Sequence, residues 1–141
     1  MVHALEESWR VLQPGGILID IRPYLGNMRL EVLNGEDHQL VGIVDDSELE
    51  DDHQAVQRAL DHGLNSGLFI IEEERRFDYE YLWDTPDDLK AYVDENWTSR
   101  SIPNSLYRKA RRMAAKLAAP PRIRIRDERV ITRFGKVVQD E

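Results

Sequence analysis

Near the start of the chain, residues 4–20 read ALEESWRVLQPGGILID. The apolar side chains here recur at the spacing of one helical face: Val2, Leu5, Trp9 and Leu12. Gln13-Pro14-Gly15-Gly16 ends this predicted helix, because proline cannot continue it and glycine readily adopts a positive φ. Ile17 to Ile21 then predicts a strand, and its weak alternation is typical of a strand covered on both faces.

Two apolar runs and a helix are expected to follow this strand. The runs 30–33 and 39–44 are joined by a segment that begins Asn34-Gly35, which favours a hairpin near residues 29–44. Ser47 and Glu50 have the spacing of a capping box and predict the start of a helix. The glycine-containing segment 63–67 is expected to end that helix.

The second half of the chain predicts one long strand and two more helices. Residues 68–83 form the strand, in which aromatic side chains alternate with charged ones from Phe77 onward. Thr85-Pro86 begins one helix and Pro103 precedes another, so both helices fall within residues 86–118. These elements together predict a mixed α+β (α/β) fold.

Isoleucine and arginine alternate after residue 121, which predicts strand structure to about residue 136. The segment either turns near Asp127-Glu128 as a hairpin or continues as one antiparallel strand. Arg122, Arg124 and Arg126 are expected to face outward, where they either bind an anionic partner or discourage edge-to-edge aggregation.

Length and composition limit the classes of protein that this chain can be. It has 141 residues, of which 41% are hydrophobic and 33% charged, as expected for a single folded domain spanning residues 1–141. It contains no cysteine, which weakly favours the cytoplasm and excludes disulfides, thiolate metal sites and thiol nucleophiles. No apolar run approaches the roughly 20 residues of a membrane-spanning helix, and no signal peptide is recognisable.

The net charge of −8 combines two regions of opposite sign. Residues 1–99 hold 7 basic and 23 acidic side chains, a net −16, whereas residues 100–141 hold 12 basic and 4 acidic, a net +8. A basic segment in an acidic protein docks on its own acidic part, on a second copy, or on a polyanion. We favour the first two, because the chain has no RGG run or RNA-binding aromatic motif.

Residues 4–20 resemble the helix, Pro-Gly-Gly turn and strand in the second half of class I S-adenosylmethionine-dependent methyltransferases. The later helix and strands are also similar to the end of that fold, whose sheet closes with an antiparallel strand. The resemblance implies two insertions, a hairpin near residues 29–44 and helices near residues 86–118.

The parts of that family that hold the cofactor have no counterpart in this sequence. The family binds S-adenosylmethionine with a glycine-rich loop and an acidic residue that follow earlier strands, and the chain has no Gly-x-Gly spacing. We therefore expect no cofactor to bind to this chain alone. The strand at residues 17–21 would then present an unpaired edge, which predicts a homodimer or a complementing chain.

Candidate ligand contacts come from two places in the sequence. In the methyltransferase family, substrate contacts follow the later strands, which implies Asp20, Arg22 and Tyr24. The aromatic strand face, with Tyr79, Tyr81 and Trp83, either packs against the helices of residues 86–118 or lines a small-ligand pocket. No catalytic residue is assigned.

No metal site is predicted. The acidic run at residues 45–52 lacks the spacing of a calcium loop and is more simply explained as acids at a helix N-terminus. The four histidines match no zinc-binding spacing.

Three functional hypotheses follow. The first is a methyltransferase-related protein without stand-alone catalysis that acts by self-association or with a partner chain. The second is the substrate side of a methyltransferase completed by an upstream half. The third is a small-ligand binding module that uses the aromatic strand face.

Overall fold

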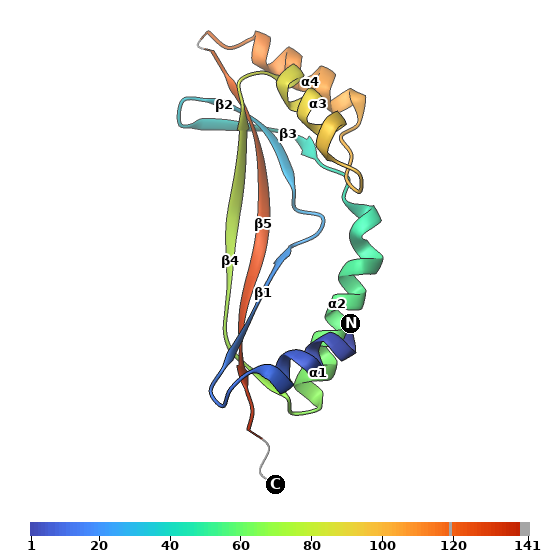
Figure 1. Cartoon of the computed structure of the whole chain (residues 1–141). Helices are drawn as coiled ribbons and strands as arrows, with labels where there is room; N and C mark the ends of the chain where they lie inside the picture. The colour runs from blue at the N-terminus through green and yellow to red at the C-terminus, as the bar shows by residue number, and fades with distance from the viewer. Residues whose placement is uncertain (119, 139–141) are drawn as a thin grey trace. The chain divides into compact units, whose positions relative to one another are not determined.

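A computed structural model describes residues 1–118 and 120–138 of the chain. The described residues contain four α-helices and five strands in antiparallel arrangement, which confirms the predicted mixed α+β class (Figure 1). They divide into two compact units. The first unit comprises residues 1–23, 50–77 and 129–138, and the second comprises residues 24–49 and 78–128. Strands β4 (Phe69–Trp83) and β5 (Arg122–Lys136) each contribute residues to both units.

The first unit begins with α1 (Val2–Val11), which packs against α2 (Glu50–Asn65) in blue and green in Figure 1. The N–H of Leu12 donates to the carbonyl of Ser8 at 3.1 Å, and Gly15 has a φ of 75° in the turn that follows. The Pro-Gly-Gly stretch therefore ends the helix as predicted. The small core of this unit is buried around Leu60, Phe69 and Phe134, against which Leu5, Trp9 and Leu12 of α1 pack.

Strand β1 (Ile17–Pro23) follows the turn and pairs antiparallel with β5, from Ile17 opposite Gly135 to Pro23 opposite Arg129. Lys136 at the end of β5 and Val137 just after it also hold α1 in place. Trp9 Nε1 donates to the carbonyl of Val137 at 2.9 Å, and Lys136 Nζ donates to the carbonyl of Leu12 at 2.6 Å. The position of β1 is thus fixed by contacts far apart in the sequence.

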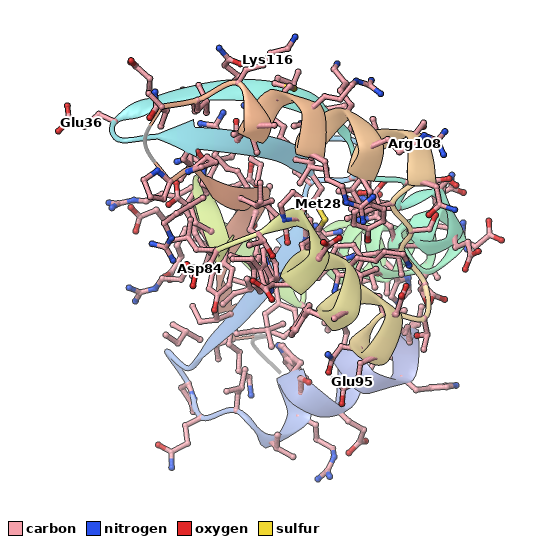
Figure 2. All side chains as sticks on the ribbon, turned by 90° about the horizontal axis from the view of Figure 1, so that it is seen from above. Met28, Glu36, Asp84, Glu95, Arg108 and Lys116 are labelled. Atoms are coloured by element: carbon pink, nitrogen blue, oxygen red, sulfur yellow. The ribbon has the colours of Figure 1, made fainter. Side chains whose placement is uncertain are left out.

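The second unit contains the predicted hairpin and the two further helices. Strands β2 (Arg29–Asn34) and β3 (Asp37–Ile43) form the hairpin, with Gly35 at a φ of 65° and Glu36 at its tip (Figure 2). Strand β2 also pairs antiparallel with residues 122–126 of β5. Helices α3 (Pro86–Asn96) and α4 (Asn104–Ala115) cover these strands, and buried side chains fill the core between them: Leu30, Val32, Leu89, Ala110, Ile123 and Ile125.

The start of the predicted helix near residue 47 differs from the expected capping box. A 3₁₀ turn, η1 (Ser47–Leu49), precedes α2. The N–H and hydroxyl of Ser47 both donate to Asp45 Oδ1, at 3.0 and 2.6 Å, so the Ser47 side chain is already committed. The helix ends at Asn65, within the predicted segment 63–67. Gly63 is buried in its last turn, and Gly67, with a φ of 70°, follows the helix end.

Strand β5 is continuous. Of the two alternatives predicted for this segment, one long strand is therefore correct and a hairpin that turns near Asp127-Glu128 is wrong. Asp127 lies inside the strand and is only 1% exposed. The strand continues through Asp127 and Glu128 because it has pairing partners on both sides of them, β2 up to Arg126 and β1 from Arg129 onward.

Candidate functional site

The first candidate site is the edge of β1 that does not face β5. Within residues 1–118 and 120–138, β1 pairs with β5 only and ends the strand order. Its isoleucines are much exposed on one face: Ile17 at 41%, Ile19 at 45% and Ile21 at 51%. The expectation that this strand is covered on both faces is therefore wrong for the described residues, since about half of each isoleucine is exposed.

A shallow hollow extends this apolar face across the first unit. It has a volume of about 250 Å³ and is lined by Ile19 of β1, Ile131 and Arg133 of β5, and Glu73 and Arg75 of β4. Arg133 is paired with Glu72, with 2.7 Å between Nε and Oε2. The face is thus apolar at β1 and becomes charged towards β4.

The opposite face of β1 carries Asp20 and Arg22. The structure brings these two predicted residues together, with 2.6 Å between Arg22 Nε and Asp20 Oδ2, and Arg22 Nη1 donates to Gln57 Oε1 at 3.2 Å. Asp20 also lines a mainly apolar hollow of about 180 Å³ with side chains of α1 and α2, among them Leu5 and Leu60. The charges of Asp20 and Arg22 therefore neutralise each other beside this hollow.

Tyr24 belongs to the second unit, whereas Asp20 and Arg22 belong to the first. Its N–H donates to the carbonyl of Glu128 at 2.8 Å, and the residue is 38% exposed. The proposed set of Asp20, Arg22 and Tyr24 is therefore divided between the units.

The aromatic residues of β4 that lie in the second unit form a continuous row. The ring centroids of Tyr79 and Tyr81 are 4.9 Å apart, those of Tyr81 and Trp83 are 6.1 Å apart, and Trp83 lies 5.3 Å from Tyr92 of α3. Tyr81 and Trp83 pack against the core of this unit, whereas Tyr79 is 48% exposed. The row combines packing against α3 with one accessible ring.

Arg124 and Arg126 do not simply face solvent, as the sequence suggested. They hold Glu31, which is 1% exposed; Arg124 Nη2 lies 2.6 Å from Oε2, and Arg126 Nη2 lies 2.8 Å from Oε1. Arg124 also pairs with Glu80 at 3.1 Å. An acid between two apolar residues of a strand, Leu30 and Val32, was the available sequence signal for this network.

The acidic residues before α2 have structural partners. Hydrogen bonds from the Ser47 hydroxyl and then from its N–H lower the pKa of Asp45. Asp46 is buried and accepts the N–H of Gly26, with the shorter distance 3.1 Å. Among the described residues, no group of three or more His, Asp or Glu side chains is arranged to hold a metal ion. None of the described helices has the length and apolarity needed to cross a membrane.

No protein-family model matches the chain, and no curated protein or solved structure is significantly similar to it.

Proposed function

We propose that this chain is a methyltransferase-related protein that lacks the cofactor-binding part and acts by self-association through the edge of β1. The helix, Pro-Gly-Gly turn and strand that carry the family resemblance are formed by α1, residues 13–16 and β1. The antiparallel pairing of β5 with β1 adds support, because the family's sheet closes with an antiparallel strand. The absence of cysteine favours the cytoplasm as the compartment.

The observation that carries this proposal is the unguarded edge of β1. An exposed strand edge invites pairing with another chain unless charge, proline or a bulge protects it. Strand β4 carries the charged run 72–76. The β2–β3 pair has a register shift at Leu30/Glu31, and Lys109 Nζ donates to the carbonyl of Val41 at 2.8 Å. Strand β1 has Pro23 at its last position, and its two charged side chains, Asp20 and Arg22, pair with each other on the face opposite the isoleucines.

The pattern of β1 favours a second copy as its partner. Isoleucine stands at positions 17, 19 and 21, so the apolar face is symmetric about Ile19. Antiparallel pairing of two β1 strands, with Ile17 opposite Ile21 of the second copy, would gather all the isoleucines on one face. A C2 dimer places such a self-complementary strand against itself.

The test is the mass in solution of the whole chain, measured by analytical ultracentrifugation at micromolar concentration. We expect a dimer, and we expect Ile19→Lys to give a monomer because a lysine in an edge strand opposes pairing. Ile71→Lys is the matched control, since Ile71 is 50% exposed in the same unit but on β4. A monomeric wild-type chain, or equal loss of the dimer in both variants, would overturn the self-association.

A second measurement tests the relation to the cofactor. Calorimetric titration with S-adenosylmethionine should show no binding, because the chain has no Gly-x-Gly loop. Micromolar affinity of this chain alone would contradict the proposal that it lacks the cofactor-binding part.

A further inference from the structure

A polar hollow of about 470 Å³ lies between α3 and the start of α4 in the second unit. Its volume is in the range of small-molecule sites. Its wall combines apolar and polar side chains from both helices and from the segment between them: Lys90, Val93, Asp94, Trp97, Arg100, Ser101, Ile102, Asn104 and Tyr107.

The segment between the helices is held firmly enough to shape a site. Ser101 exchanges two backbone hydrogen bonds with Asp45, at 2.9 and 3.0 Å. Ile102 is 7% exposed and belongs to the core of this unit. The segment that carries Arg100 is therefore held in place by the two residues that follow it, Ser101 and Ile102.

Two features along the hollow favour negative charge: Arg100 and the N-terminus of α4. Arg100 is half-buried, and no hydrogen bond or ion pair joins its side chain to another described residue. Pro103 supplies no side-chain cap to α4, so the first N–H groups of this helix, at Asn104 and Ser105, have no acceptor within the helix. Helix N-termini of this kind favour negative charge.

Tyr107 gives an independent sign of a missing partner. It lines the hollow and is only 3% exposed, yet its hydroxyl is buried without a hydrogen-bond partner in the part of the chain described. Buried hydroxyl groups are normally paired, because leaving one unpaired costs free energy. Burial, and to a smaller extent the charge of Asp94, raises the pKa of Tyr107 to about 12, so the hydroxyl stays protonated at neutral pH and is available to donate.

The negative charge in the hollow is already balanced. Asp94 Oδ2 lies 2.7 Å from Lys90 Nζ, and Lys90 Nζ is 5.5 Å from the centre of the Tyr107 ring. Arg100 is therefore the uncompensated charge of the wall, and Trp97 and Val93 supply apolar surface beside it.

We propose that this hollow binds a small organic carboxylate, whose carboxylate group is held by Arg100 and the first N–H groups of α4, with its apolar body against Trp97. Binding would bring the Tyr107 hydroxyl, which is closed off in the free chain, into contact with the ligand's oxygen atoms. A carboxylate fits better than a neutral ligand, because a guanidinium group and N–H groups form their strongest hydrogen bonds to charged oxygens.

The experiment is a titration of the whole chain with benzoate, followed by two-dimensional ¹H–¹⁵N NMR at constant ionic strength. We expect saturable shifts at the amides of Asn104 and Ser105 and at the Trp97 indole, and none with benzamide, which has the same ring without the charge. Arg100→Gln should weaken binding at least about tenfold, the loss of a charge-assisted hydrogen bond. Tyr107→Phe should weaken it less, because it keeps the ring and loses only one neutral donor.

Arg108→Gln is the matched control, because Arg108 lies on α4, is exposed and does not line the hollow (Figure 2). It should leave the benzoate affinity unchanged. Equal weakening by Arg100→Gln and Arg108→Gln, shifts spread over the surface, or no saturation would each overturn the proposal. Benzoate binding at this site does not depend on whether the chain is a monomer or a dimer, so this site and the β1 edge are tested separately.

Discussion

At the scale of single residues, Glu31 is a buried carboxylate that holds two arginines of the second unit. It is 1% exposed, and each of its two oxygens accepts from one arginine, Arg124 or Arg126. Removal of one member of a buried ion pair is strongly destabilising, because the remaining charge is left without compensation. The pairing of these arginines also explains why they are not available to an outside partner.

We expect Glu31→Gln to lower the free energy of unfolding by about 3 kcal/mol, since two half-buried guanidinium groups would lose their shared carboxylate. Urea denaturation of the whole chain measures this loss. Glu36→Gln is the control, because Glu36 lies exposed at the hairpin tip (Figure 2) and should change stability by no more than about 0.5 kcal/mol. Asp78 Oδ2 also lies 3.8 Å from Arg126 Nη1. A loss no larger than that of the control would mean that Glu80 compensates Arg124 and Asp78 compensates Arg126.

At the scale of elements, the close approach of α4 to β3 depends on Gly42. A Cβ atom at this position would lie 2.6 Å from Leu106 Cδ2 and 2.9 Å from Cδ1. Both distances are far below van der Waals contact, so a larger residue would force Leu106 or the helix to move. Glycine at this position leaves the space that the end of the Leu106 side chain occupies.

Gly42→Ala should therefore destabilise the protein by roughly 1 to 3 kcal/mol, the usual cost of overpacking. In a Leu106→Ala background the clash is absent, and the same substitution should cost much less. A double-mutant cycle by urea denaturation gives this coupling directly. Additive effects of the two substitutions would show that α4 does not pack on Gly42 in solution.

The elements that were predicted correctly from the sequence depend on local signals. The end of α1 follows from Pro14 and Gly15, the hairpin from Asn34-Gly35, and the start of α3 from Thr85-Pro86, where Asp88 N–H donates to Thr85 Oγ1 at 3.1 Å. Each of these signals acts within a few residues, so neighbouring elements do not alter it.

The features that the sequence did not predict depend on distant partners. Whether the chain turns at Asp127 or continues as β5 is decided by β1 and β2, which come about a hundred residues earlier. Ser47 caps no helix because Asp45 binds it first. The burial of Tyr107 has no local signal in the sequence, because it requires α3 to lie beside it.

At the scale of the whole chain, ion pairs join several arginines of the basic segment to acids in the acidic part of the sequence. The basic segment 100–141 is paired within each unit with acids from residues 1–99: Arg111 with Asp87, Arg122 with Asp84, Arg124 with Glu80, and Arg133 with Glu72. These pairs support the prediction that the basic segment docks on acidic parts of the same protein. Their partly exposed positions make them sensitive to salt.

The last prediction is that the protein does not bind nucleic acid, because these arginines already have carboxylate partners. A fluorescent DNA duplex should show no anisotropy change with the wild-type chain at about 0.1 M salt, at protein concentrations where non-specific binders, with Kd of about 10⁻⁴ to 10⁻⁶ M, are saturated. Removing three partner acids should release the arginines and give weak, salt-dependent binding; the variant is Glu80→Gln, Asp84→Asn and Asp87→Asn.

A charge-matched variant separates released arginines from a simple gain in net charge. Three exposed acids without an ion pair in the described chain provide it: Glu36→Gln, Asp51→Asn and Glu95→Gln. Both variants carry the same net charge, so long-range attraction to DNA is equal in the two. If only the first variant binds, local pairing neutralises the basic segment. If the two bind equally, the net charge alone keeps the protein from DNA, and the pairing has no role in it.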